Sequence, residues 1–252
     1  MPPHAGAGNS SNVRARWDHV RVDVVPLLRT TRLLSDLSPL AVAELAPHTR
    51  ERHFAAHQVV WLEGDPVDGL YVLVDGVLKS YRATPDGQEL ILIFNAVGDT
   101  AGDVGLFHPA QIRHVNVTAM AATRCLVIPR DPLVAFLARH PPAMLRMLEQ
   151  VATIAVKAAT SYSELAFHDI RARVAAALLA LAEEYGEQTP TGTRIRLQLS
   201  QATLAALVAA SRENVNRALA GFVASGAVAH AERQFEIRDR AALVSARDRS
   251  KQ

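Results

Sequence analysis

Residues 200–226 read SQATLAALVAASRENVNRALAGFVASG, and they predict two helices joined by a very short turn. Ser200 and Ser211 are favourable N-cap residues, because a serine side chain accepts a hydrogen bond from a backbone N–H in the first helical turn. The first helix is expected from about Gln201 to Val208 and the second from Ser211 to Ser225. This layout is typical of a helix-turn-helix, in which the second helix enters the major groove of DNA.

The second helix carries side chains suited to reading base edges. An arginine presents two donors that match O6 and N7 of guanine, and a glutamate accepts from N4 of cytosine, so Arg212, Glu213 and Arg217 are expected to favour G·C pairs. The alternative is a solvated face on which Glu213 and Arg217 form an i, i+4 ion pair. The predicted DNA-binding residues are Ser200, Gln201, Ser211, Arg212, Glu213, Asn214, Asn216 and Arg217.

The C-terminal third of the chain is weakly basic. From Asp169 onward, Lys and Arg number 12 against 9 Asp and Glu, whereas the residues before it hold 15 against 16, which gives the net charge of +2. This distribution is compatible with a nucleic-acid-binding module. The apolar residues expected to face the core of that module are Leu204, Leu207 and Val208 in the first helix and Val215, Leu219, Phe222 and Val223 in the second.

Between His53 and Ile128 the sequence changes to short runs rich in leucine and β-branched residues, punctuated by glycines. The tetrapeptide PDGQ at 85–88 is a favourable hairpin turn. Evenly spaced short strands with such turns predict a closed antiparallel barrel or roll. The single cysteine of the chain, Cys125, falls in one of these strands and is expected to be a buried, inert thiol.

A heptad pattern follows the predicted roll. From Met144, apolar residues recur at intervals of four and three, which is the condition for two helices to pack along each other. We therefore predict a long helix that forms a parallel homodimer, and the alternative is a helix that lies only on its own roll. The predicted dimer residues are Met144, Leu148, Val151, Ala155, Ala158, Tyr162 and Leu165.

The rest of the sequence bears on the class of protein. Residues 1–16 are rich in Pro, Gly, Ser and Asn and are expected to be disordered. No apolar run is long enough to span a bilayer and the start lacks a secretory signal, so a cytoplasmic protein is expected. We find neither a metal-ligand cluster nor a nucleophile with a base, and therefore expect neither a metal site nor an enzyme. Short amphipathic helices are predicted after the N-terminal segment, with the apolar stripe Leu34, Leu37, Leu40 and Leu45.

Residues 102–114, GDVGLFHPAQIRH, hold one carboxylate and one guanidinium ten residues apart and no other Asp, Glu, Lys or Arg. Asp103 and Arg113 are candidates for holding a small, partly anionic ligand beside Gly102 and Gly105, because a glycine-bounded helix start next to a guanidinium suits an anion. The alternative is a salt bridge between Asp103 and Arg113 in a roll that has no ligand.

The whole chain resembles the CRP/FNR family of bacterial transcription regulators, and is most similar to the branch of the cAMP receptor protein. The resemblance covers roughly Leu33 to Asp239 and rests on the glycine-punctuated roll, GDVGLF…R, ELAFHDIRARVAAALLALA and SRENVNRAL. It implies an α+β fold with a cyclic-nucleotide-binding-like β-roll (jelly roll), a long dimerisation helix and a C-terminal winged helix-turn-helix. The implied parts are a partly disordered N-terminal extension (1–32), the β-roll effector domain (33–141), the dimerisation helix (142–168) and the DNA-binding domain (169–252). For residues 1–32, a disordered tail and an added helix that contacts the roll both stay open.

For DNA binding, the resemblance implies that Arg212, Glu213 and Arg217 occupy the family's three base-reading positions. The implied target is an inverted repeat of GTGA-like half-sites that matches a homodimer, with RNA polymerase as a further partner. The N-terminal cysteine cluster of the nitrate/fumarate branch is absent, which removes iron–sulfur oxygen sensing.

For the roll, the resemblance implies a phosphate-binding cassette. The backbone N–H groups of residues 102–106 would face a cyclic phosphate, Arg113 would pair with that phosphate, and Asp103 would hold the ribose hydroxyl. The implied effector-binding residues are Gly102, Asp103, Val104, Gly105, Arg113, His114, Ala158 and Ala159.

The sequence departs from the family pattern at four of these positions. Asp103 is one methylene shorter than the usual glutamate, and His114 stands where the family has serine or threonine. Ala158 and Ala159 replace the polar residues that hydrogen-bond adenine across the dimer in the family. The loss of two hydrogen bonds of roughly 0.5 to 1.5 kcal/mol each is enough to lower the affinity for cAMP by one or two orders of magnitude. Three alternatives therefore stay open: control by cAMP, control by another small anionic ligand, and DNA binding that is independent of any ligand.

Two other classes of protein compete with a DNA-binding regulator. A cyclic nucleotide hydrolase built on the roll is disfavoured, because no paired carboxylates or metal ligands can be located in the sequence. A ligand-sensing regulator that acts through protein partners is the other, and its failure to bind a GTGA palindrome would distinguish it.

Overall fold

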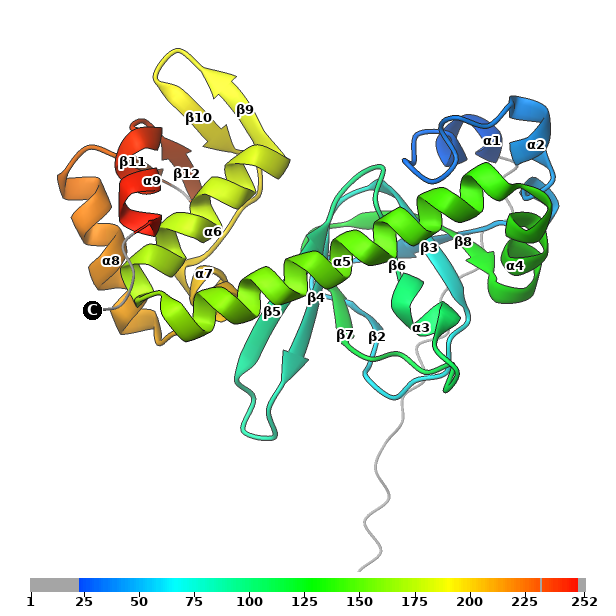
Figure 1. Ribbon diagram of the computed structural model, residues 1–252, viewed down its shortest axis with the longest axis horizontal. Helices are drawn as coiled ribbons and strands as arrows, with labels where there is room; N and C mark the ends of the chain where they lie inside the picture. Colours follow the sequence, from blue (N-terminus) through cyan, green and yellow to red (C-terminus); the bar gives the residue numbers. More distant parts are fainter. Residues whose placement is uncertain (1–22, 232, 249–252) are drawn as a thin grey trace, which may run out of the picture.

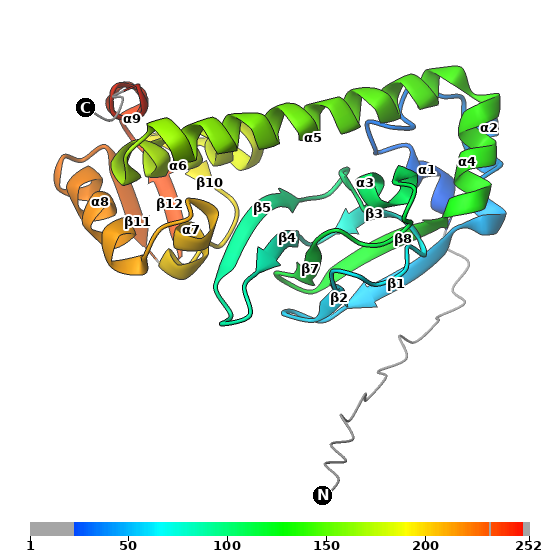
Figure 2. The same cartoon turned by 60° about the horizontal axis from the view of Figure 1, so that its bottom comes forward.

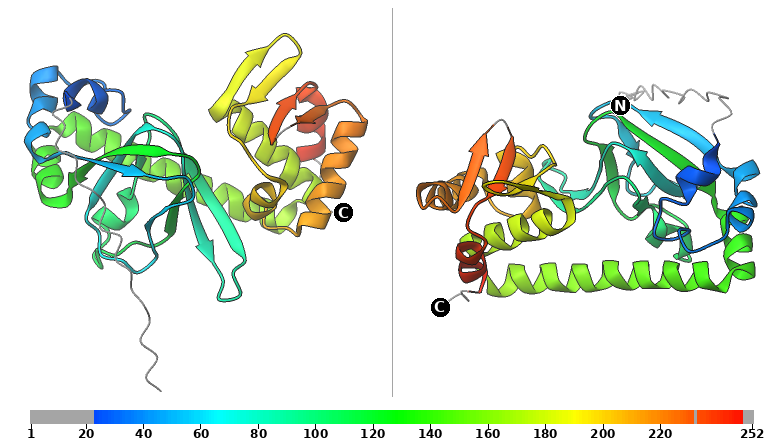
Figure 3. Two further views of the ribbon diagram at one scale, coloured as in Figure 1. Left: turned by 180° about the vertical axis from the view of Figure 1, so that it is seen from behind. Right: turned by 90° about the horizontal axis from the view of Figure 1, so that it is seen from above.

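A 27-residue helix, α5 (Pro141–Phe167), runs the length of the molecule and joins its two domains. The structure is a computed structural model that describes residues 23–231 and 233–248. Both domains lie on the same side of α5, the N-terminal one along its first part and the C-terminal one at its end (Figures 1 and 3). Within these ranges, no helix is both long and apolar enough to cross a membrane.

The N-terminal domain contains two four-stranded antiparallel sheets, with strand orders β1-β8-β3-β6 and β2-β7-β4-β5. Gly87, with a φ of +84°, lies in the turn between β4 and β5, where the PDGQ motif predicts a hairpin. The predicted antiparallel roll is confirmed. Its strands are β1 (Arg50–Phe54), β2 (Val59–Trp61), β3 (Gly69–Asp75), β4 (Leu78–Ala83), β5 (Glu89–Asn95), β6 (Thr100–Ala101), β7 (Asn116–Ala119) and β8 (Thr123–Pro129).

Aromatic side chains occupy the interior of the roll. Phe54, Trp61 and Tyr71 are buried in one cluster with Cys125, and the rings of Trp61 and Tyr71 meet edge to face with centroids 4.9 Å apart. Burial raises the pKa of the Cys125 thiol to about 12, so this thiol is protonated at neutral pH and lies out of reach of solvent. The expected buried thiol is confirmed.

Short helices pack at one end of the roll, near the start of α5 (Figure 2). Leu28, Leu34, Phe136 and Met147 belong to their shared core. These elements are α1 (Val24–Leu28), α2 (Pro39–Ala43), the 3-10 helix η1 (Ala46–His48) and α4 (Arg130–Arg139). One more short helix of this domain, α3 (Asp103–Phe107), belongs to the cassette.

One expectation for this region is wrong, and one open alternative is decided. Leu40 is 84% exposed although it was expected in the apolar stripe, because α2 is only five residues long and turns Val42 toward the core instead. Leu28 of α1 is fully buried in the core shared with the roll, so for the described part of residues 1–32 the structure has the alternative of an added helix that contacts the roll. The expected disorder of residues 1–16 lies outside the described residues.

The C-terminal domain is built on α6 (Ile170–Tyr185), against which α8 (Arg212–Ala224) and α9 (Arg240–Arg247) pack. Ser200 accepts a hydrogen bond from the Thr203 N–H (3.0 Å) and Ser211 from the Asn214 N–H (3.3 Å), so both serines are N-caps. The other elements are α7 (Gln201–Leu207), α8 (Arg212–Ala224), α9 (Arg240–Arg247), β9 (Gly186–Thr189), β10 (Gly192–Ile195), β11 (Val228–Ala231) and β12 (Gln234–Ile237), with sheet order β11-β12-β10-β9.

The predicted core of the helix pair is largely correct. Leu204 and Val208 are buried beneath α7, and the buried positions of α8 follow a three-and-four spacing from Val215 to Phe222. Val223 is the exception, because it stands beside that stripe and is 46% exposed. Val208 is the C-cap of α7 rather than its last helical residue.

The two domains share a hydrophobic core. Ile91 and Phe94 of β5 are buried in the same cluster as the apolar residues of α6, α7 and α8. The Tyr185 hydroxyl, at the end of α6, donates a hydrogen bond to the Phe94 carbonyl oxygen (2.6 Å). Next to it, Lys157 Nζ of α5 lies 3.1 Å from Glu184 Oε1. These contacts fix the C-terminal domain against β5 and against α5.

Candidate effector pocket and nucleic-acid interface

Two glycines allow the cassette to close around Arg113. Gly102 precedes α3 (Asp103–Phe107) with a φ of +97°, a left-handed conformation that favours glycine. A Cβ at Gly102 would overlap the Arg113 guanidinium, and one at Gly105 would lie 2.7 Å from the Ile112 carbonyl oxygen. The turn at 102–105 therefore depends on the absence of side chains at both positions.

The Arg113 side chain is buried in the roll, only 2% exposed, with its guanidinium carbon 4.0 Å from the centre of the Trp61 ring. Its Nη2 donates to Asp68 Oδ1 (2.5 Å) and to the Gly69 carbonyl oxygen (3.0 Å). Nε and Nη1 are also buried, and no acceptor for either lies among the described residues. Because a buried donor without an acceptor is unfavourable, this edge of Arg113 is suited to an anionic group.

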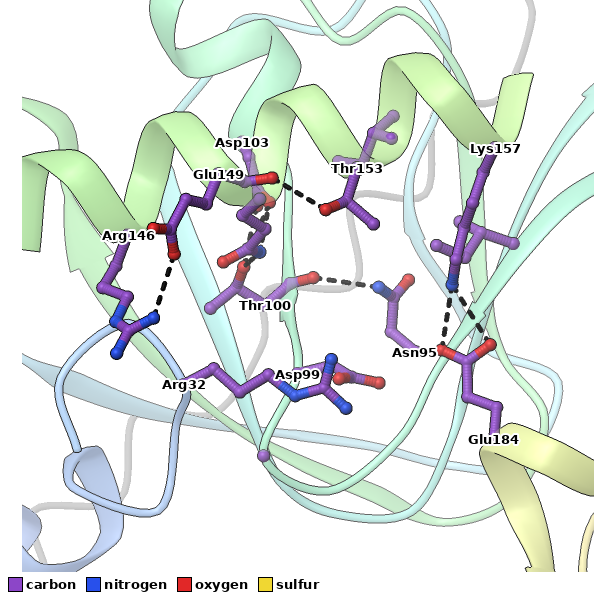
Figure 4. Close-up of a pocket in the computed structure, with 14 residues that line it drawn as sticks. Arg32, Asn95, Asp99, Thr100, Asp103, Arg146, Glu149, Thr153, Lys157 and Glu184 are labelled. Atoms are coloured by element: carbon purple, nitrogen blue, oxygen red, sulfur yellow. Dashed lines mark hydrogen bonds and ion pairs between the residues drawn. The ribbon is translucent and has the colours of Figure 1, made fainter. Parts of the chain in front are cut away.

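Asp103 does not pair with Arg113. The carboxylate is 3% exposed and accepts hydrogen bonds from the Thr100 hydroxyl (3.0 Å) and from Gln150 Nε2 of α5 (2.6 Å), as Figure 4 shows for Thr100. Burial raises the pKa of Asp103, partly opposed by these hydrogen bonds. The alternative of an Asp103–Arg113 salt bridge is wrong, because Arg113 takes Asp68 as its partner instead.

A cleft of about 250 Å³ lies between the roll and α5, next to Asp103 (Figure 4). Charged pairs border it: Arg146 with Glu149 at 3.0 Å, and Lys157 with Glu184. Burial, together with the charge of Glu184, raises the pKa of Asp99 in its wall. The lining residues are Arg32, Ile93, Asn95, Gly98, Asp99, Thr100, Asp103, Arg146, Glu149, Gln150, Thr153, Ile154, Lys157 and Glu184.

The other expected effector residues differ in their surroundings. The His114 ring packs edge to face on His108, with centroids 4.4 Å apart, and its Nε2 is buried with no described partner. Val104 is 43% exposed on α3. Ala158 and Ala159 are exposed on α5, do not line the cleft and offer no side-chain hydrogen bond. In this single chain, the cassette residues are thus brought together, whereas the two alanines are not part of their cluster.

Asp68, Trp61, Thr100 and Gln150 were not anticipated from the sequence. Asp68 and Trp61 complete the surroundings of Arg113, and Thr100 and Gln150 those of Asp103. Of these four residues, only Gln150 could have been found from the sequence. It is not a heptad residue of the long helix, so it is free to face the roll beside which that helix was expected to pass.

The predicted dimer residues of α5 are mostly exposed in the single chain. Leu148 is 58% exposed and Tyr162 76%, Ala155, Ala158 and Leu165 are exposed as well, while Met144 and Val151 are half-buried. Large apolar side chains held in water along one helix are typical of a surface that another protein covers.

Helix α8 presents the predicted base-reading side chains to solvent. Arg217 Nη2 lies 3.0 Å from Glu213 Oε1, with side chains 73% and 82% exposed, so the i, i+4 pair of the alternative interpretation is present. Arg212 and Asn216 are exposed beside this pair, and Asn214 is half-buried. The hydroxyls of Ser200 and Ser211 are used as caps, and Gln201 is half-buried at the start of α7.

Comparison with known proteins assigns both domains to families. Residues 51–140 match a model of the cyclic nucleotide-binding domain, and residues 172–246 match a model of the Crp-like helix-turn-helix domain. The chain is 32% identical over 200 residues to the CRP-like cAMP-activated global transcriptional regulator of Mycobacterium tuberculosis, covering 79% of this chain and 89% of the relative. The chain belongs to the CRP/FNR family of transcription regulators.

Other members of the CRP/FNR family support the same assignment. The cAMP-activated global transcriptional regulator CRP of Escherichia coli is 29% identical over 158 residues, covering 62% of this chain and 74% of the relative. The structure of CLP, the c-di-GMP-responsive global regulator of Xanthomonas campestris, superposes with a TM-score of 0.68 at 25% identity, covering 79% of this chain and 99% of CLP.

Among the described residues, no group of three His, Cys, Asp or Glu side chains could hold a metal ion.

Replacement of Gly102 by alanine tests how far the cassette depends on its contact with Arg113. We expect Gly102→Ala to lower the free energy of unfolding by about 2–4 kcal/mol, because the left-handed backbone and the overlap with the guanidinium are both unfavourable. Gly87→Ala is the matched control, since Gly87 has a similar φ of +84° with no atom within 4 Å of the added Cβ, and about 1 kcal/mol is expected. Urea denaturation measures both, and equal losses would contradict the role of the Arg113 contact.

Proposed function

We propose that this chain binds DNA as a homodimer at an inverted repeat of GTGA-like half-sites, with α8 in the major groove and Arg212, Glu213 and Arg217 at base edges. The observation that carries the proposal is the exposure of these three side chains on the second helix of a capped helix-turn-helix. Arg212 and Arg217 would each read a guanine, and Glu213 a cytosine.

The ion pair between Glu213 and Arg217 does not oppose this role. An exposed i, i+4 pair contributes only about 0.3–0.5 kcal/mol, whereas a well-formed bidentate contact with a base is worth about 1–3 kcal/mol. Opening the pair in the groove is therefore a small cost.

Helix α5 supports the dimer part of the proposal. Its exposed heptad face would pack against the same face of a second copy, which removes apolar side chains such as Leu148 and Tyr162 from water. Symmetry would then place two copies of α8 about one helical turn of DNA apart, as an inverted repeat requires. RNA polymerase is proposed as a further partner at such sites, in the cytoplasm, and no catalytic activity is proposed for the chain.

The roll is proposed to bind a small anionic effector. Nε and Nη1 of Arg113 would hold its phosphate, and a cyclic nucleotide is the ligand class that the relatives suggest, since the M. tuberculosis protein is cAMP-activated and CLP is c-di-GMP-responsive. The residues present fit the phosphate end of such a ligand. They fit the base end less well, because Ala158 and Ala159 carry no polar group.

A second candidate is DNA binding without an effector. Asp103, which would hold a ribose hydroxyl, already accepts hydrogen bonds from Thr100 and Gln150, so a ligand has to displace these partners. This observation favours a roll that is complete by itself, and calorimetry separates the two candidates.

Arg212→Ala tests base reading. We expect a roughly 5- to 150-fold loss of affinity for a GTGA palindrome, equivalent to about 1–3 kcal/mol, and a relaxed preference at one G·C pair, because two guanine contacts are removed. Fluorescence anisotropy with a GTGA duplex and single-base variants measures this change. Arg139→Ala, which removes an exposed arginine of the roll, is the control.

The outcome on other sequences decides the role of Arg212. Equal loss on every duplex would identify Arg212 as a phosphate contact instead of a base contact. If the unchanged protein binds neither the GTGA duplex nor a scrambled one at moderate salt, with or without ligand, a regulator that acts through protein partners is favoured.

Calorimetric titration with cAMP, cGMP and c-di-GMP tests the effector. We expect binding heat from one of these ligands and at least a tenfold weaker affinity in Arg113→Gln, because charge-assisted hydrogen bonds to the phosphate are lost. Arg82→Gln, at an exposed arginine paired with Glu63, should bind as the unchanged protein does. No heat from any ligand would support the ligand-independent candidate.

Two leucines of α5 test the dimer face. We expect Leu148→Asp to yield monomers in sedimentation velocity, because a charge is placed on the heptad face. Leu145→Asp changes a leucine of similar exposure, 60% against 58%, that is not a heptad position, and should leave the dimer intact. Dimers in both variants would contradict the proposed face.

A further inference from the structure

We propose that Arg173 and Arg171 are positioning residues that hold the helix-turn-helix to the start of α6. Asp169 caps α6 and follows directly on His168, the C-cap of α5, so both arginines lie at the junction of the two helices. Neither belongs to the base-reading set. The inference rests on the proposed function, because the orientation that they hold is the one in which α8 would meet DNA.

Arg173 supports the turn between α7 and α8. Its Nη1 donates to the carbonyl oxygens of Val208 (2.8 Å) and Ala209 (3.4 Å). These carbonyls stand at the C-terminal end of α7, where backbone acceptors lack helical partners and the helix dipole is negative. A guanidinium there satisfies acceptors and complements the dipole at the same time.

The turn between α7 and α8 contains a residue in an unfavourable backbone conformation. Ala209 has a φ of +50°, a left-handed conformation that is unfavourable for any residue with a Cβ and is normally taken by glycine at the end of a helix. One further hydrogen bond, from the Ala210 N–H to the Ala205 carbonyl oxygen (3.1 Å), closes the turn. Arg173 therefore holds the strained residue from outside the helix pair.

Arg171 contacts the far end of α8. Its guanidinium carbon lies 4.4 Å from the centre of the Phe222 ring, and a Cβ at Gly221 would lie 2.7 Å from Arg171 Nη1. The glycine thus permits the close approach. Because Arg173 holds the turn before α8 and Arg171 the last part of α8, the helix is attached at two points to one turn of α6.

Attachment at these two points fixes the orientation of α8 relative to α6. A rotation of α6 at its junction with α5 would carry the turn and α8 with it as one body. The positioning role predicts a loss of sequence-specific binding, which needs the correct angle in the groove, without an equal loss of non-specific binding, which depends on phosphate charges.

Arg173→Met tests the proposal, because it removes the donors and keeps a long apolar stem. We expect about a tenfold loss of affinity for a GTGA duplex, less than a twofold loss for a scrambled duplex, and an unchanged salt dependence. Arg173→Lys, which keeps a positively charged donor group, should restore part of the affinity. Arg240→Met removes another arginine of the domain, paired with Glu183, and should have no effect. A proportional loss on both duplexes with a reduced salt slope would overturn the proposal, since it identifies a phosphate contact.

Hydrogen exchange gives a measurement that does not depend on DNA. In Arg173→Met, the amide of Ala210 should exchange about tenfold faster, while amides in the middle of α6 keep their rates. Ala209→Gly in the same background should slow that exchange again, because glycine removes the left-handed penalty. Unchanged exchange at Ala210 would overturn the positioning role. If the unchanged protein binds no DNA, the proposed function fails, and the exchange result still decides whether Arg173 supports the turn.

Discussion

Helix α5 has to serve two neighbours with one surface, and the arrangement of both domains depends on this constraint. Each residue of an α-helix is rotated by about 100° from the one before, so residues three or four apart share a face. Gln150, Ile154 and Lys157 form the face toward the cleft and the roll, whereas Leu148, Ala155 and Tyr162 form another, which the chain leaves exposed. Contact with the roll therefore leaves the heptad face free for a second copy.

The cassette and the C-terminal domain are connected through contacts on α5. Asp103 is hydrogen-bonded to Gln150, and two turns further along the helix Lys157 reaches Glu184 of α6. Beside that pair, Tyr185 is bonded to Phe94 of the roll. Polar contacts thus join the cassette to α5 and α5 to α6, and the hydrophobic core around β5 joins the roll to the C-terminal domain.

Features with local causes could be predicted from the sequence. Both serine caps, the helix-turn-helix and the PDGQ hairpin depend on residues within a few positions of each other. The long helix is predicted by the regular spacing of its apolar residues. The pairs Arg113–Asp68 and Asp103–Gln150 could not be predicted, since they join residues 45 and 47 positions apart that only the packing of the roll brings together. Leu40 shows a related limit, because a five-residue helix is too short for periodicity to fix its buried face.

The place of Cys125 has a practical consequence. The only sulfhydryl of the chain is enclosed in strand β8, beneath the aromatic side chains of the roll, and is held in its unreactive protonated form. Alkylating reagents can reach it only when the sheets separate. The rate of its alkylation therefore measures the opening of the roll and does not report movements of the helix-turn-helix.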